Sequence, residues 1–188
     1  MKLLQVLILS ASLALPSLCR AESDIFWEAE SADETNMPIA GPSRPLSPEE
    51  AEKLSGGAWR NGKSVEGGSG EIFADYTLNV PTAGNYSFFA RKFWQHGAFR
   101  WRIDGGEWHE VRKTTLLDSV TMREYIPINW VYLEEVVLTA GEHKLRIEVV
   151  EDPDYEFSKA YAFDCFLLTR GRLEDYLDAH PEIKGEPR

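Results

Sequence analysis

The chain has 188 residues, of which 43% are hydrophobic and 27% charged, and its net charge is −11. So acidic a chain is repelled by phosphate backbones and by anionic lipid headgroups, which argues against nucleic acid and anionic membrane surfaces as partners. A neutral ligand or a cation remains compatible with the charge. The length is sufficient for one domain with a real hydrophobic core.

The first 21 residues have the pattern of an export signal. Lys2 supplies a positive start, and Leu3–Leu15 is an apolar run too short to cross a bilayer. Cleavage after Ala21 would remove two basic residues and no acid, and so change the net charge from −11 to −13. Lipidation of Cys19 is the alternative, although Leu18 is bulkier than the residue that usually precedes a lipidated cysteine. We expect a secreted or periplasmic protein without membrane insertion.

The mature chain opens with a short strand and a long loop. In Phe26–Glu30, FWEAE, the alternation places the carboxylates of Glu28 and Glu30 on one face of the expected strand. The stretch from 36 to 70 is rich in proline and glycine, as expected of a loop. Within it, Ser47-Pro48-Glu49-Glu50 forms a capping box with proline in the first turn, which predicts a short helix through Leu54.

From Glu71 onward the pattern changes to short strands separated by glycine and proline turns. Apolar and polar residues alternate clearly in Phe99–Asp104 and His143–Val149, and Asp104-Gly105-Gly106 predicts a hairpin turn. The expected strands are 73–80, 86–93, 99–103, 108–111, 130–138, 143–149 and 161–169. Short strands at this spacing predict an all-β fold, an antiparallel sandwich.

The predicted organisation is a signal peptide at 1–21, a sandwich domain at 22–170 and a helical tail at 171–188. Arg172–His180 has the pattern of a short amphipathic helix that ends before Pro181. The mature chain keeps only Cys165, so it has no internal disulfide, and the phenylalanines around this cysteine predict a buried filler. Asp164 lies in the same apolar run, where a charge is costly unless it is paired or binds a metal.

Five segments in a fixed order carry a resemblance to a known family. They are FWEAE, then DYTLNVPTAGNYSFFAR (75–91), FRWRIDGGEW (99–108), NWVYLEEVVLTAGEHKLRIEV (129–149) and AFDCFLLTR (162–170). Their order resembles that of the carbohydrate-binding modules of families 6 and 35, which have a galactose-binding-like β-sandwich. The resemblance covers Phe26 to Arg170 and implies a jelly roll.

The resemblance also implies a structural Ca²⁺ ion. Glu28, Glu30 and Asp164 match the carboxylate ligands of the family, and backbone carbonyls of the first long loop would complete the site. Calcium prefers six to eight oxygen ligands, and carboxylates supply the charged ones. The alternative is a solvated edge strand for the two glutamates and a salt bridge from Asp164 to an arginine.

Ligand binding in these modules depends on aromatic rings that stack on sugar rings. Trp130 matches the stacking tryptophan at the head of its strand. The chain departs from the pattern at Ala162, where family 6 often has asparagine, and at 65–70, which lacks a second stacking aromatic. Arg91 is a candidate for bonding sugar hydroxyls, with a plain ion pair as the alternative. Loop residues that could replace the missing ring are Trp94, His96, Tyr125 and Tyr155.

The sequence therefore predicts a non-catalytic domain that binds a polysaccharide or oligosaccharide as a monomer. None of the four histidines falls in a metal-binding pair, and Glu28 and Glu30 are too close in sequence to flank a glycosidic bond from opposite sides. An exported interaction or scaffold domain without a sugar ligand is the main alternative. A glycan-active enzyme is the less favoured one.

Overall fold

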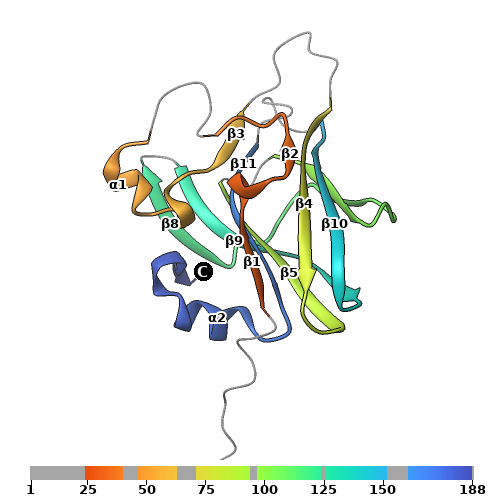
Figure 1. Ribbon diagram of the computed structural model, residues 1–188. Helices are drawn as coiled ribbons and strands as arrows, with labels where there is room; N and C mark the ends of the chain where they lie inside the picture. The colour runs from red at the N-terminus through yellow and green to blue at the C-terminus, as the bar shows by residue number, and fades with distance from the viewer. Residues whose placement is uncertain are drawn as a thin grey trace, which may run out of the picture.

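The computed structural model describes residues 24–39, 46–62, 71–93, 97–123, 126–151 and 161–187. In these residues two antiparallel sheets pack face to face (Figure 1). The predicted antiparallel β-sandwich is therefore confirmed. None of the helices in the described residues is long and apolar enough to cross a membrane.

The larger sheet, here sheet A, contains both ends of the described chain. Its strands follow the order β1-β11-β5-β9-β8-β12, and β3 also pairs with β11. Their bounds are β1 Ile25–Glu28, β3 Arg60–Gly62, β5 Gly84–Phe93, β8 Asp118–Arg123, β9 Ile126–Leu138, β11 Tyr161–Thr169 and β12 Glu186–Pro187.

The smaller sheet, sheet B, has the order β2-β4-β10-β6-β7. Its strands are β2 Glu34–Thr35, β4 Ile72–Val80, β6 Phe99–Ile103, β7 His109–Val111 and β10 Gly141–Val149. The alternation in β6 behaves as predicted, because Phe99 and Trp101 are buried whereas Arg100 and Arg102 are only partly buried.

Aromatic rings from both sheets fill the space between them. Trp27 of β1 stacks on Phe166 of β11 with ring centroids 5.4 Å apart. Phe88 of β5 meets Trp101 of β6 edge-on at 5.1 Å, and this contact joins the two sheets. Such edge-on and offset arrangements are the favoured geometries of aromatic pairs.

Two short helices flank the sheets, as predicted. The capping box is present at α1 (Pro48–Ala51), where the Glu50 amide donates to Ser47 Oγ at 3.2 Å and Glu50 Oε2 accepts from the Ser47 amide at 2.9 Å. The helix is shorter than expected, and the 3₁₀ turn η3 (Ser55–Gly57) follows it. The predicted C-terminal helix is α2 (Leu173–Ala179), followed by the 3₁₀ turn η4 (Pro181–Ile183).

One local prediction is wrong. The FWEAE strand ends at Glu28, and Glu30 lies in the 3₁₀ turn η2 (Ala29–Ser31). Ser31 Oγ donates a 2.7 Å hydrogen bond to the Glu28 carbonyl, which favours a turn over continued strand. The two glutamates therefore do not share a strand face.

The residues after Arg170, here called the tail, pack on the outer face of sheet A. Leu173, Leu177 and Ile183 of the tail form an apolar cluster with Phe89, Trp130, Cys165 and Leu167 of the sheet. The tail covers β11 at Cys165 and Leu167, a second cluster with Leu54 and Trp59 covers it at Ala162, and all nine residues of the strand are buried. This explains why the strand reads as an apolar run without alternation.

Candidate functional site

The prediction that Trp130 stacks on a sugar is wrong in this structure. The side chain is fully buried, with an exposed fraction of 0%. Its Nε1 donates a 3.0 Å hydrogen bond to the carbonyl of Ile183, and the tail covers the ring. Trp130 is a core residue that joins β9 to the tail.

Arg91 is likewise unavailable to a ligand, and its predicted contact with sugar hydroxyls is wrong. Its side chain is 1% exposed, and Nη1 lies 2.7 Å from Asp164 Oδ2. A β-bulge between Phe163 and Cys165 inserts Asp164 as an extra residue in β11 opposite β5, where its carboxylate meets Arg91. The alternative of a plain ion pair between Asp164 and an arginine is confirmed.

The other predicted sugar-binding residues, Trp94, His96, Tyr125 and Tyr155, lie outside the described residues. Their role stays a prediction.

Glu28, Glu30 and Asp164 each have one buried carboxylate oxygen that accepts no hydrogen bond. These atoms are Glu28 Oε2, Glu30 Oε2 and Asp164 Oδ1. Burial, together with the charges of Glu28 and Asp164, raises the pKa of Glu30 to about 7. Burial also raises the pKa of Asp164 to about 7, against the opposing effect of Arg91. The charged forms of the three carboxylates are thus disfavoured where they lie, mainly by burial.

The donor chemistry of these carboxylates fits a Ca²⁺ ion, which binds hard anionic oxygens. Ser55 Oγ donates to Glu28 Oε1 at 2.6 Å, so the loop at η3 lies against the same acids and is close enough to lend oxygens. Among the described residues, however, no three acidic, histidine or cysteine side chains are already gathered tightly enough to hold an ion. Binding would require the carboxylates to move toward one another.

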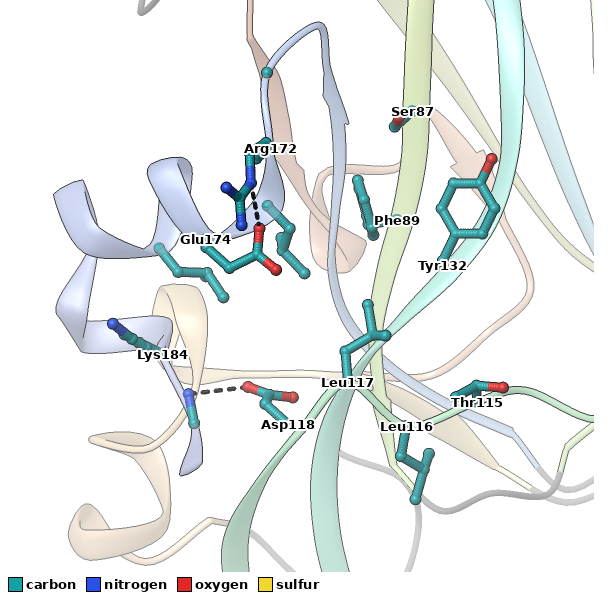
Figure 2. Close-up of a pocket in the computed structure, with 14 residues that line it drawn as sticks. Ser87, Phe89, Thr115, Leu116, Leu117, Asp118, Tyr132, Arg172, Glu174 and Lys184 are labelled. Atoms are coloured by element: carbon teal, nitrogen blue, oxygen red, sulfur yellow. Dashed lines mark hydrogen bonds and ion pairs between the residues drawn. The ribbon is translucent and has the colours of Figure 1, made fainter. Parts of the chain in front are cut away.

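A groove of about 720 Å³ lies between the outer face of sheet A and the tail (Figure 2). Its apolar lining comes from Phe89, Leu116, Leu117, Tyr132, Leu173 and Leu177, and its polar lining includes Ser87, Thr115, Asp118, Arg172, Glu174 and Lys184. Figure 2 shows Phe89 and Tyr132 on one side and Arg172 with Glu174 on the other. The lining is amphiphilic, with an apolar floor and a charged rim.

Tyr132 is the exposed aromatic ring of this groove. Its exposed fraction is 46%, and the Phe89 ring meets it edge-on at a centroid distance of 5.4 Å. The signal was present in the sequence, because Tyr132 is two residues after Trp130 and so projects from the same face of β9. That face was expected to be open at Trp130, but the tail covers Trp130 and leaves Tyr132 exposed.

Asp118 fastens the tail at one end of the groove. Its Oδ1 accepts a 2.6 Å hydrogen bond from the Trp130 amide, and its Oδ2 accepts a 2.9 Å bond from the Gly185 amide. Both carboxylate oxygens are thereby engaged by main-chain donors. Asp118 is a structural residue of the groove and not a free acid.

The fold of this sandwich is similar to that of solved carbohydrate-binding modules. The chain matches the CBM35 from Cellvibrio japonicus Abf62 with a TM-score of 0.50 and 12% identity, over 80% of this chain and 95% of that one. It matches a family 35 carbohydrate-binding module from Clostridium thermocellum with a TM-score of 0.50 and 13% identity, over 78% and 97%. The chain therefore has the fold of these modules, as the resemblance predicted.

A larger protein carries the same fold as one of its parts. The match to the GH26-CBM35 β-(1,4)-mannanase of Podospora anserina has a TM-score of 0.51 and 15% identity, and covers 80% of this chain. This chain spans only 28% of that enzyme. No family model and no curated protein matches the sequence.

Proposed function

We propose that this chain, with the fold of a family 35 module, is a non-catalytic carbohydrate-binding domain. The observation that carries the proposal is an exposed ring, Tyr132, set in an amphiphilic groove on a sandwich of this kind. Sugar sites combine an aromatic surface with a few polar groups that fix orientation. Fold alone would not suffice, because one fold hosts many functions.

The groove contains no pair of free acids among the described residues that line it. Asp118 accepts hydrogen bonds from two main-chain amides, so only Glu174, which pairs loosely with Arg172 at 3.3 Å, is left as an acid in this lining. Glycoside hydrolysis requires two carboxyl groups on opposite sides of the scissile bond. The lining therefore favours binding without catalysis.

The proposed domain also has a structural calcium site. Glu28, Glu30 and Asp164 would supply the charged ligands, and the ion would neutralise their buried charge. These residues lie in β1, η2 and β11, so an ion bound to all three would link β1 and η2 to β11. This part of the proposal rests on the three carboxylate oxygens that lack hydrogen-bond partners.

The proposal is tested with the chain from residue 22 and Ca²⁺ present. It should bind at least one class of polysaccharide or oligosaccharide on a glycan array, confirmed by calorimetry, and release no product from that glycan. Binding to none of the glycans would favour an interaction domain without a sugar ligand. Product release would identify an enzyme.

We also propose a secreted or periplasmic, monomeric protein. The apolar run at Leu3–Leu15 and the small residue Ala21 support cleavage by a signal peptidase. Mass spectrometry of the exported protein should find Glu22 at its start, and a diacylated Cys19 would contradict this. Light scattering of the exported protein should give the mass of one chain.

A further inference from the structure

We propose that the groove between sheet A and the tail is the glycan-binding site, with one pyranose ring stacked on Tyr132. The inference rests on the proposed function and states where on the domain the glycan binds. It replaces the sugar contact that Trp130 cannot make, because that ring is buried under the tail.

Tyr132 is held in place before any ligand binds. It lies directly opposite Phe89 in the register of β9 and β5, and the edge of one ring faces the other at 5.4 Å. Side chains carried on strands are positioned more accurately than those on loops. The ring therefore offers a stacking surface without a large loss of side-chain freedom on binding.

The rim of the groove supplies partners for sugar hydroxyls. Arg172 Nε lies 3.3 Å from Glu174 Oε2, and both side chains are about 70% exposed, so the pair is loose and its other donors and acceptors face solvent. Lys184 adds a cation that is paired with Asp178, while Ser87 and Thr115 add hydroxyls. Charged and neutral hydrogen-bonding groups therefore surround the apolar floor.

A sugar matches this lining better than a purely apolar ligand does. A pyranose has a C–H face for the floor and hydroxyls for the rim. An aliphatic ligand or a leucine-rich peptide would cover the floor but remove water from the charged rim without replacing its hydrogen bonds, which is unfavourable. The balanced rim also favours a neutral glycan over an anionic one.

The tail makes one wall of the groove and lies beyond the segment, Phe26–Arg170, that carries the resemblance. Leu173 and Leu177 of α2 contribute the apolar part of that wall. The wall is fixed by the hydrogen bond from Trp130 to Ile183 and by that from Gly185 to Asp118. Trp130 thus acts on the groove as a positioning residue, through the tail.

The test is calorimetry of single variants with the strongest glycan from the array. Tyr132→Ala should weaken binding roughly thirtyfold, the usual loss for an aromatic anchor. Tyr132→Phe keeps the ring and should stay within a few-fold of the wild type. Trp108→Ala is the matched control, because Trp108 stacks on Arg100 and Arg102 of sheet B, away from the groove. Each variant is checked for an unchanged unfolding curve.

A second measurement locates the ligand without mutation. In a methyl-labelled sample, the leucine resonances of Leu117, Leu173 and Leu177 should shift on titration with the glycan. Full binding by Tyr132→Ala, or a loss of binding in Trp94→Ala with these leucines unmoved, would overturn the inference and leave the proposed function standing. If the wild type binds no glycan, both the proposed groove site and the proposed function are rejected. The same conclusion follows if the groove binds only an apolar peptide.

Discussion

Trp130 Nε1 donates a 3.0 Å hydrogen bond to the main-chain carbonyl of Ile183, and so fastens β9 to the tail. The ring lies in an apolar cluster with Leu173 and Leu177 of α2. In the modules that the sequence resembles, a tryptophan at this point is expected to meet the sugar. In this chain Trp130 instead packs against the tail and donates a hydrogen bond to it.

Replacing Trp130 should therefore affect stability first. Trp130→Ala removes a fully buried indole and should lower the free energy of unfolding by about 3–5 kcal/mol. Trp130→Phe keeps most of the packing and loses the Nε1 hydrogen bond, which should cost about 1 kcal/mol. Urea unfolding followed by tryptophan fluorescence and circular dichroism measures both changes. Wild-type stability in Trp130→Ala would show that the tail does not cover this ring in solution.

The alternation of apolar and polar residues was sufficient to predict β6 and β10, because each has an apolar face on the core and an opposite face rich in charged residues. It did not predict β8, where only Val120 and Met122 alternate with polar residues and which lies between β9 and the short β12. It also started β9 at Trp130, four residues after its observed start at Ile126. Local pattern is informative only where one face of a strand is buried and the other is not.

Site residues were harder to predict than strands because their environment is set by contacts distant in sequence. The tail helix was predicted, but not the face on which it docks, and Ile183 is 53 residues from Trp130. Asp164 was correctly identified as needing a partner. Its pairing with Arg91, 73 residues earlier, depends on a bulge in β11 that the run FDCFLL does not reveal.

Calcium should stabilise the domain, because an ion that binds only the native state favours it by mass action. At a hundredfold excess over the dissociation constant the gain is about 2.7 kcal/mol. Glu30→Gln should reduce this gain. In chelator the same variant should melt above the wild type, because it removes a half-buried carboxyl group whose pKa is raised to about 7 by burial and by neighbouring acids. Thermal melts with Ca²⁺ and with EDTA measure both effects.

Glu34→Gln is the control for that experiment, because Glu34 is exposed and should respond to calcium like the wild type. Asp164→Ala should abolish the calcium response, but it also breaks the buried pair with Arg91 and should cost about 3–5 kcal/mol without the ion. If EDTA leaves the wild-type melt unchanged, the three acids do not bind calcium.

His143 should make stability depend on pH. Its Nδ1 lies 2.6 Å from Asp104 Oδ2 and its Nε2 lies 2.9 Å from the Thr139 carbonyl, so both nitrogens face acceptors. Burial by itself would lower the pKa of His143, but the hydrogen bonds to Asp104 and Thr139, with the Asp104 charge, raise it above its ordinary value of 6.5. A raised pKa means that the folded state holds the proton more tightly than the unfolded state does.

This contribution to stability is complete below pH 6.5 and is lost as the pH rises through the folded-state pKa. The difference in melting temperature between the wild type and His143→Gln should therefore be larger at pH 5.5 than at pH 8.5. A gap between wild type and His143→Gln that does not change with pH would mean that His143 is not charged in the folded state.

Cys165 should be inert in the native domain. Its side chain is fully buried, and burial together with the nearby Asp164 charge raises the pKa of the thiol well above the usual value. A thiol reagent should therefore modify the chain from residue 22 only under denaturing conditions, at one site per chain. Rapid labelling of the folded protein would show that the outer face of β11 opens in solution.

The central claim, that this domain binds a glycan in the groove beside the tail, is tested most directly by a crystal structure. The chain from residue 22 would be crystallised with Ca²⁺ and soaked with the oligosaccharide that binds most tightly in solution. We expect a sugar ring on the exposed face of Tyr132, with its hydroxyls near Arg172 and Glu174 and with the tail in place over Trp130. Sugar density elsewhere on the domain with the groove empty, or a tail displaced by sugar stacked on Trp130, would contradict it.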